Sequence, residues 1–308
     1  MGIFNEFFKK EKPVFTGSRF GFGSGGSAGI PNGPFSASGG NVDDTSNFPG
    51  YIVSVFTSSG SYTIEGSGTA TVRYLAVGGG GGGINGTEGS CGGGGAGAYI
   101  DATAQISAGT YPIVIGGGGS ATNNASPGGT TRINFPTTIR ADGGGRGGAA
   151  AAAPPSPVAS PGHDSPGNGS GGGGGWIYGS SPAGGGQPPS GQGGAGGEYG
   201  NPGGQGTYFQ DPHVGGGGGG AGSPGLPGAS NNGKGGDGLG TYPFVPPSYG
   251  DPQPDGRYFA GGGHGVNRNG PEAPDSKGGA PSYQGHGGNS NADPGGSGIV
   301  IIAVAIDQ

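Results

Sequence analysis

Runs of consecutive glycine constrain this chain more than any other feature. Glycine supplies 89 of its 308 residues, with unbroken runs at 78–83, 171–175 and 215–220. Average soluble proteins contain about 7% glycine, and glycine loses more conformational freedom on folding than any other residue. Because the runs have no side chains to bury, only backbone hydrogen bonds could offset the entropy lost in ordering them.

Two states of the runs are compatible with this composition. One is disorder, since 89 glycines and 28 prolines make up 117 of the 308 residues. The other is a bundle of polyglycine II helices, in which each residue points its N–H and C=O outward to neighbouring helices. The aromatic residues between the runs, such as Trp176 and Tyr178, favour the bundle. Collagen is excluded, because the G-X-Y period is present only in the fragment 222–228.

Segments rich in β-branched and aromatic residues flank the glycine runs and predict strands at 51–56, 62–64, 69–77, 98–100, 111–115 and 131–135. The final apolar run, 299–306, indicates a strand buried on both faces. We therefore expect a mostly β protein: a small antiparallel β-sandwich base that carries packed polyglycine helices and protruding loops, with almost no α-helix.

The first 20 residues differ from the rest. Ile3, Phe4, Phe7 and Phe8 form an apolar stripe on a predicted short helix that Pro13 ends. The predicted domains are a docking segment (1–20), a flexible linker (21–49) and a glycine-rich domain (50–308). The base of this domain comprises 50–77, 98–140 and 298–306, and the glycine lattice and its loops comprise 78–97 and 141–297. The stripe is expected to dock on a partner, although a frayed tail is the alternative.

The order of these motifs resembles a known family. Val72–Val77 running into six glycines, Gly92–Tyr99, Ala108–Gly116 and the closing Gly295–Ile302 are similar to phage glycine-rich tail-fibre domains. The N-terminal Phe-Phe-Lys-Lys-Glu-Lys-Pro segment resembles leaders on fibre-like virion proteins of marine T4-like cyanophages. In the related adhesins that cap T-even long tail fibres, polyglycine helices carry variable turns that bind outer-membrane proteins or lipopolysaccharide. The resemblance implies attachment at one end and receptor contact at the other.

Two regions are candidates for receptor contact. The turn 84–91, with Asn85 and Glu88, follows a run that leads away from the base, and by the same logic 149–170 is a distal loop. The segment 241–259 concentrates rings among stiffening prolines, which is typical of binding hot spots. Its candidate contacts are Tyr242, Phe244, Tyr249, Arg257, Tyr258 and Phe259. The alternative is that these rings cover the side of the lattice as a hydrophobic sheath.

The sequence contains few patterns typical of catalytic, nucleotide-binding or metal-binding sites. Its formal net charge is −6 without a basic patch, which argues against nucleic-acid binding. Gly228–Lys234 lacks the Ser or Thr and the helix that a phosphate-binding loop needs. The four histidines, at 163, 213, 264 and 286, have none of the spacings of metal sites. We expect no enzyme activity, no cofactor, no metal, no membrane span and no secretion signal.

These observations predict a virion protein of a phage tail fibre, assembled in the host cytoplasm. Its expected partners are other tail-fibre or virion proteins, through the N-terminal segment, and a host outer-membrane protein or lipopolysaccharide. The alternatives are a structural virion protein of the tail or head without host contact, and a chaperone of fibre assembly.

Overall fold

Ten strands form the regular part of the fold over the described residues. The computed structural model describes residues 35–84, 91–122, 125–148, 169–175, 199–206, 215–228, 233–265, 275–279, 283–290 and 293–306. The strands are β1 (Ser36–Ser38), β2 (Val42–Asp44), β3 (Tyr51–Phe56), β4 (Gly60–Val77), β5 (Tyr99–Val114), β6 (Thr131–Asn134), β7 (Thr138–Ala141), β8 (Asp251–Gln253), β9 (Gly256–Tyr258) and β10 (Ile299–Ala305). All of them belong to one compact unit, residues 32–308.

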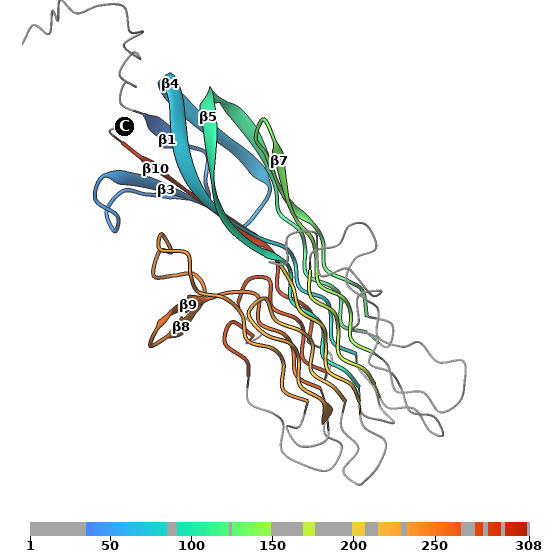
Figure 1. Ribbon diagram of the computed structural model, residues 1–308. Coiled ribbons are helices and arrows are strands. Elements are labelled where there is room, and N and C mark those ends of the chain that lie inside the picture. The colour runs from blue at the N-terminus through green and yellow to red at the C-terminus, as the bar shows by residue number, and fades with distance from the viewer. Residues whose placement is uncertain are drawn as a thin grey trace, which may run out of the picture. The chain divides into compact units, whose positions relative to one another are not determined.

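The last strand of the chain lies inside the main sheet (Figure 1). The sheet order is β2-β3-β10-β4-β5-β6-β7, with β1 paired to β4 and β8 paired to β9 in a separate hairpin. In β10, Val300 lies opposite Phe56 on one side and Ala76 on the other, and both pairings are antiparallel. The side chains from Ile299 to Val304 are at most 2% exposed. This confirms the prediction of a strand buried on both faces.

The main sheet curls around one of its own faces. β4 and β5 are long, and their pairing shifts register between Ile64 and Thr69. At this irregularity Gly66 and Gly68 have φ values of +145° and +87°. Residues with a side chain rarely adopt such positive φ values, so glycine allows the backbone to bend here. An inner cluster of buried side chains joins both halves of β4 to β10, β5 and β6 and includes Phe56, Tyr62, Ile64, Val72, Tyr74, Ile106, Ile113, Ile133, Val300 and Ile302. This cluster is the main hydrophobic core.

The described residues contain almost no helix, which confirms the predicted class of a mostly β protein with antiparallel sheets. The predicted helix at the N-terminus lies outside the described residues. One boundary differs from the expectation. β1 and β2 lie in the segment 21–49, which composition predicts to be linker, and Phe35 before them is buried. Pairing with β4 and β3 orders these short polar strands, and tertiary pairing leaves no signal in local composition.

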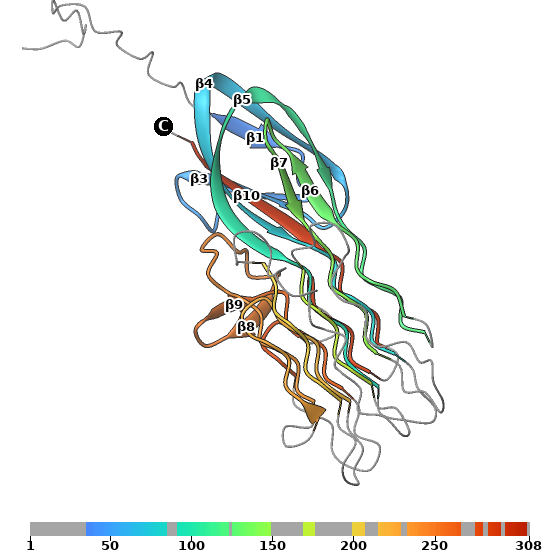
Figure 2. The same cartoon turned by 45° about the vertical axis from the view of Figure 1, so that its right-hand side comes forward.

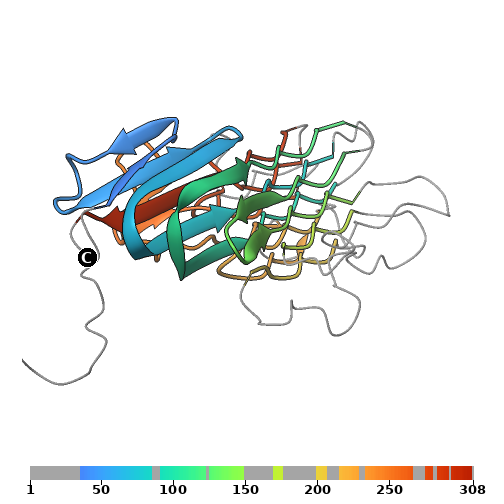
Figure 3. The ribbon, with the colours of Figure 1, turned by 90° about the horizontal axis from the view of Figure 1, so that it is seen from above.

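Glycine-rich segments continue from the strand ends and lie side by side (Figures 2 and 3). We call this set the glycine array, its junction with the sheet the base end, and the opposite end the far end. Its segments are 78–84, 91–98, 116–122, 125–130, 142–148, 169–175, 199–206, 215–228, 233–238, 259–265, 285–290 and 293–298. The segments between 116 and 130 are hydrogen-bonded into the array, although the sequence predicts that they belong to the base.

The backbone N–H groups of residues 78–83 donate hydrogen bonds to three different segments in strict rotation. Gly78 and Gly81 donate to Ala98 and Gly95, Gly79 and Gly82 to Gly129 and Ser126, and Gly80 and Gly83 to Gly296 and Asp293, with N···O distances of 2.9–3.1 Å. The donors therefore repeat every three residues. A β-strand repeats every two residues and bonds to two neighbours at most.

The carbonyl groups of the same segment accept hydrogen bonds from three further segments. Gly79 and Gly82 accept from Gly144 and Gly147, Gly80 accepts from Gly119, and Gly81 accepts from Gly288. Residues 78–83 thus bond to six surrounding segments. Residues 92–97 and 215–220 show the same rotation: Gly216 and Gly219 donate to Gly174 and Gly171, while Gly217 and Gly220 donate to Leu226 and Ser223.

Glycine is needed at these interior positions because the backbones approach closely. A Cβ built at Gly81 would overlap the carbonyl oxygen of Gly145, and one built at Gly218 would overlap that of Gly94. Gly117, on the outside of the array, is different, since a Cβ there would meet no atom within 4 Å. Close contact between backbones therefore excludes side chains from the interior and tolerates them at the edge.

Neighbouring segments of the array run in either direction. Gly145 donates to Ser170 and Gly148 donates to Gly173, so segments 142–148 and 169–175 are parallel and both lead away from the sheet. Ser170 is fully buried and donates to the carbonyl of Ala96 near the base end. The expectation that Ser170 belongs to a distal loop is therefore wrong, because it assumed strict alternation of direction. Residues 149–168 of that loop lie outside the described part.

Candidate functional site

The aromatic loop, residues 241–259, lies against the outer face of the main sheet. Its anchor is Tyr242, which is buried. The Tyr242 hydroxyl donates a 2.9 Å hydrogen bond to the carbonyl oxygen of Arg73, and its backbone N–H donates to the hydroxyl of Tyr99 at 3.0 Å. Burial raises the pKa of the Tyr242 phenol well above its usual range. The ring thus joins the loop to β4 and β5.

An ion pair on the sheet borders this anchor. The Arg73 guanidinium donates two 2.9 Å hydrogen bonds to the carboxylate of Asp101 and lies over the Tyr242 ring, 5.8 Å from its centroid. The Arg73 side chain is 41% exposed and the Asp101 side chain 12%. The hydrogen bonds with Asp101 raise the pKa of Arg73. This two-pronged pair fixes the edge of the aromatic loop and leaves a cationic group accessible to solvent.

Phe244 continues the anchor toward the surface. Its ring centroid lies 5.9 Å from that of Tyr242, 5.7 Å from Phe48 and 4.6 Å from Tyr51. Tyr51 is 36% exposed, and Phe48 and Phe244 are half-buried. These three rings form an aromatic patch at the rim of the sheet. Such a patch can bury apolar surface against a partner.

The hairpin of β8 and β9 forms the tip of the aromatic loop. Tyr258 donates a 2.8 Å hydrogen bond to Asp255, and the Lys277 ammonium lies 3.0 Å from the Asp255 carboxylate and 4.6 Å from the centroid of the Tyr258 ring. This pairing lowers the pKa of Asp255 and raises that of Lys277. The Arg257 side chain donates to the carbonyl of Tyr249 at 3.0 Å. The hairpin is therefore held by polar contacts within the loop and by Lys277, which lies outside it.

Phe259 ends the aromatic loop and is fully buried. Its ring packs against Gly250, where an added Cβ would come within 3 Å of the ring. The next residue, Ala260, has a φ of +56°, the left-handed region that residues other than glycine seldom adopt. This strained backbone turns the chain from the aromatic loop into array segment 259–265.

The predicted site residues thus occupy different environments. Tyr242 and Phe259 are buried in the outer cluster with Val53, Leu75 and Ile301 of the main sheet, so both are packing residues, whereas the sheath alternative places such rings along the side of the lattice. Phe244, Tyr249, Arg257 and Tyr258 are half-buried near the base end, and receptor contact by them stays a prediction. Asn85 and Glu88 lie outside the described residues, as do Ile3, Phe4, Phe7 and Phe8.

Sequence reasoning missed the sheet residues that receive the aromatic loop. The sequence pattern does not distinguish Tyr51 or Phe48 from the other apolar residues near them. Arg73 carries a usable signal, because it interrupts the apolar stretch 72–77 at the end of β4, on the face that bears Leu75 and Val77. A charge at such a position needs a partner, which here is Asp101.

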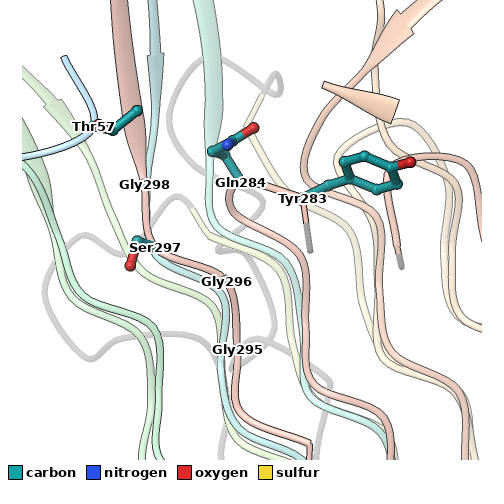
Figure 4. Close-up of a pocket in the computed structure, with 7 residues that line it drawn as sticks. All are labelled: Thr57, Tyr283, Gln284, Gly295, Gly296, Ser297 and Gly298. Atoms are coloured by element: carbon teal, nitrogen blue, oxygen red, sulfur yellow. The ribbon is translucent and has the colours of Figure 1, made fainter. Parts of the chain in front are cut away.

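A pocket of about 370 Å³ opens where the sheet meets the array (Figure 4). It is lined by Thr57, Tyr283, Gln284, Gly295, Gly296, Ser297 and Gly298. Bare glycine backbone forms much of one wall, and the side chains of the seven residues named are neutral: a threonine, a tyrosine, a glutamine and a serine. The pocket can therefore offer neutral hydrogen-bonding groups.

Two further features bear on function. Among the described residues, no three His, Cys, Asp or Glu side chains lie close enough together to hold a metal ion. No helix in the described part of the chain is both long and apolar enough to cross a membrane.

Comparison with known proteins places the chain in a family defined by its glycine content. No curated protein matches the sequence. A family model described as "Glycine-rich domain" matches residues 57–305, from the turn after β3 to the end of β10. This range includes the strands that flank the array as well as the array itself, so the chain belongs to the glycine-rich domain family.

Proposed function

We propose that this protein is a non-enzymatic adhesin of a phage tail fibre, which recognises a receptor on the bacterial surface through loops carried by the glycine array. The receptor would be an outer-membrane protein or lipopolysaccharide, and the protein would act in the virion after assembly in the host cytoplasm. Other fibre or virion proteins would hold it through the N-terminal segment with Ile3, Phe4, Phe7 and Phe8. No cofactor takes part in this role.

We infer that the array is a bundle of polyglycine II helices on a sandwich-like base. The support is the rotation of hydrogen bonds in residues 78–83, which repeats every three residues and engages six neighbours. Three residues per turn is the period of polyproline II geometry, and glycine allows such helices to pack on all sides. Bonding in many directions stiffens the bundle, which suits a support for binding loops.

The observation that carries the proposal is the fixation of loop ends at the far end of the array. Ile84 is 2% exposed and Cys91 is 1% exposed, and they pack together with Ala125. These two residues flank the turn that holds Asn85 and Glu88. A loop whose two ends are fixed loses less entropy when it binds a partner, which favours recognition.

Binding to host cells tests the proposal. The purified full-length chain should bind the bacterium that the parent phage infects, and it should protect those cells from infection. A double variant, Asn85→Ala with Glu88→Ala, should lose both effects, while the matched control Lys234→Ala on the side of the array keeps them. Absence of binding and protection by the wild-type chain would contradict the adhesin role.

A structural virion protein without host contact is the second candidate. The aromatic patch of Phe48, Tyr51 and Phe244 favours it, because this surface lies at the sheet rather than at the far end and suits a protein contact. Incorporation into virions without cell binding would select this candidate. Absence from mature particles would instead indicate a chaperone of fibre assembly.

A further inference from the structure

The first half of β5 forms an open edge of the main sheet. On one side, residues 99–107 pair with β4. On the other side, β6 pairs only with Ile113 and Val114, near the end of the strand. Among the described residues, no backbone group bonds to residues 100–106 from that side. We call residues 100–106 the edge segment; an edge of this kind presents alternate N–H and C=O groups to a further strand.

The edge segment lacks the features that usually protect an edge from pairing with another chain. The edge strands β1, β2 and β7 are only three or four residues long, β2 ends in two aspartates and β7 holds an arginine. The edge segment is longer and contains neither proline nor lysine. Its one charged residue, Asp101, is already paired with Arg73. Thr103 and Gln105 are exposed.

The sequence of the edge segment is almost the same in both directions. It reads Ile-Asp-Ala-Thr-Ala-Gln-Ile, with Thr103 at the centre. If two copies of it pair antiparallel with Thr103 opposite Thr103, each isoleucine lies opposite an isoleucine and each alanine opposite an alanine. Asp101 then lies opposite Gln105 of the second copy, so no like charges face each other. The segment is therefore complementary to itself.

We propose that two copies of this chain associate through their edge segments, forming a two-fold symmetric dimer in which the two main sheets become continuous across Thr103. A two-fold contact requires a surface that complements itself, and the near-palindrome provides one. A strand from a different protein would not require such symmetry. The second copy is therefore the occupant that the sequence of this edge favours.

The faces of the two sheets also match in this register, because residues opposite each other in an antiparallel pair lie on the same face. Ile100 and Ile106 belong to the inner cluster, with half-buried Ala102 and Ala104 between them. Pairing would continue this apolar face from one copy into the other. Since the contact comprises only a short segment of each chain, the dimer is weak and depends on protein concentration.

Sedimentation of the full-length chain over a range of concentrations tests the dimer. The wild-type protein should shift from monomer to dimer as its concentration rises. The variant Thr103→Lys places two ammonium groups opposite each other at the two-fold axis, so its dimer dissociation constant should be at least tenfold higher. The matched control is Ser61→Lys, an exposed position in the first half of β4, which should dimerise like wild type.

A charge swap tests the register of the pairing. Thr103→Lys and Thr103→Glu should each be monomeric alone, whereas an equal mixture of the two should form a heterodimer, because an ammonium then faces a carboxylate. The Thr103 side chain is exposed, so both variants should fold, and thermal melting checks this.

Three results would overturn the proposal. One is a wild-type chain that stays monomeric at every concentration at which it is soluble. Another is a dimer that folded Thr103→Lys does not weaken. The third is a mixture of the Lys and Glu variants that remains monomeric. None of these results depends on host-cell binding, so they are separate from the adhesin proposal.

Discussion

The Tyr242 hydroxyl donates a 2.9 Å hydrogen bond to the backbone carbonyl of Arg73, which lies 169 positions earlier in the chain. This bond joins the aromatic loop to the middle of β4, a strand that leads directly into array segment 78–83. The aromatic loop, whose rings are candidates for receptor contact, is thus anchored at Tyr242 to the base of the array.

Removing this hydroxyl should destabilise the protein. In the variant Tyr242→Phe the carbonyl of Arg73 loses its buried donor, which we expect to lower the free energy of unfolding by about 1–2 kcal/mol. Urea denaturation followed by tryptophan or tyrosine fluorescence measures the change. The control is Tyr258→Phe, which removes an exposed hydrogen bond to Asp255 and should change stability by less than about 0.5 kcal/mol. Equal stability of Tyr242→Phe and wild type would show that the bond does not anchor the loop.

A side chain inside the array should disrupt it. The variant Gly218→Val places a branched side chain against the carbonyl of Gly94, so we expect a loss of about 3 kcal/mol or more, or failure to fold. Gly81→Val should behave similarly, because its Cβ would meet Gly145. Gly117→Ala is the matched control, since its Cβ meets nothing within 4 Å. Thermal melting that does not distinguish Gly218→Val from Gly117→Ala would contradict close packing of backbones.

Acid should weaken the turn after β2. Hydrogen bonds from Asn47 and Ser46 lower the pKa of Asp44 from its ordinary value of 3.8 to about 2. A depressed pKa means that the ionised carboxylate stabilises the fold above pH 4, and that this contribution is lost as pH falls from about 4 to 2. Denaturant midpoints measured at pH 5 and at pH 2.5 should therefore fall further for wild type than for Asp44→Asn. Equal falls in the two proteins would place the acid sensitivity elsewhere.

Part of this architecture was predictable because its causes are local in the sequence. The unbroken apolar run of β10 predicts a strand buried on both faces. The glycine runs 78–83 and 215–220 have no side chains to bury, so they can be ordered only by hydrogen bonds between backbones. The strands β1 and β2 were not predictable, because only pairing with distant strands orders three-residue polar segments. The direction of segment 169–175 was also not predictable from the sequence, because glycine segments can form hydrogen bonds with parallel and antiparallel neighbours alike.

The candidate site was harder to predict than the fold. Composition identified the aromatic loop but could not separate Tyr242 and Phe259, which are buried, from Phe244 and Tyr258, which are not. The difference in burial depends on which rings contact Tyr99, Arg73 and Gly250. Tyr99 and Arg73 are far from the loop in the sequence, and Gly250 lies within the loop but nine residues before Phe259. Burial of a ring is set by tertiary contacts, while its hot-spot character is a property of residue type.

Hydrogen–deuterium exchange of the glycine amides tests the central claim most directly. If the N–H groups of 78–83, 92–97 and 215–220 are bonded to neighbouring segments, they should exchange only on the timescale of global unfolding, as slowly as the amides of β10. Resolved exchange of the native full-length protein by mass spectrometry or NMR gives the comparison. Rapid exchange throughout these three segments, alongside slow exchange in β10, would contradict a hydrogen-bonded array.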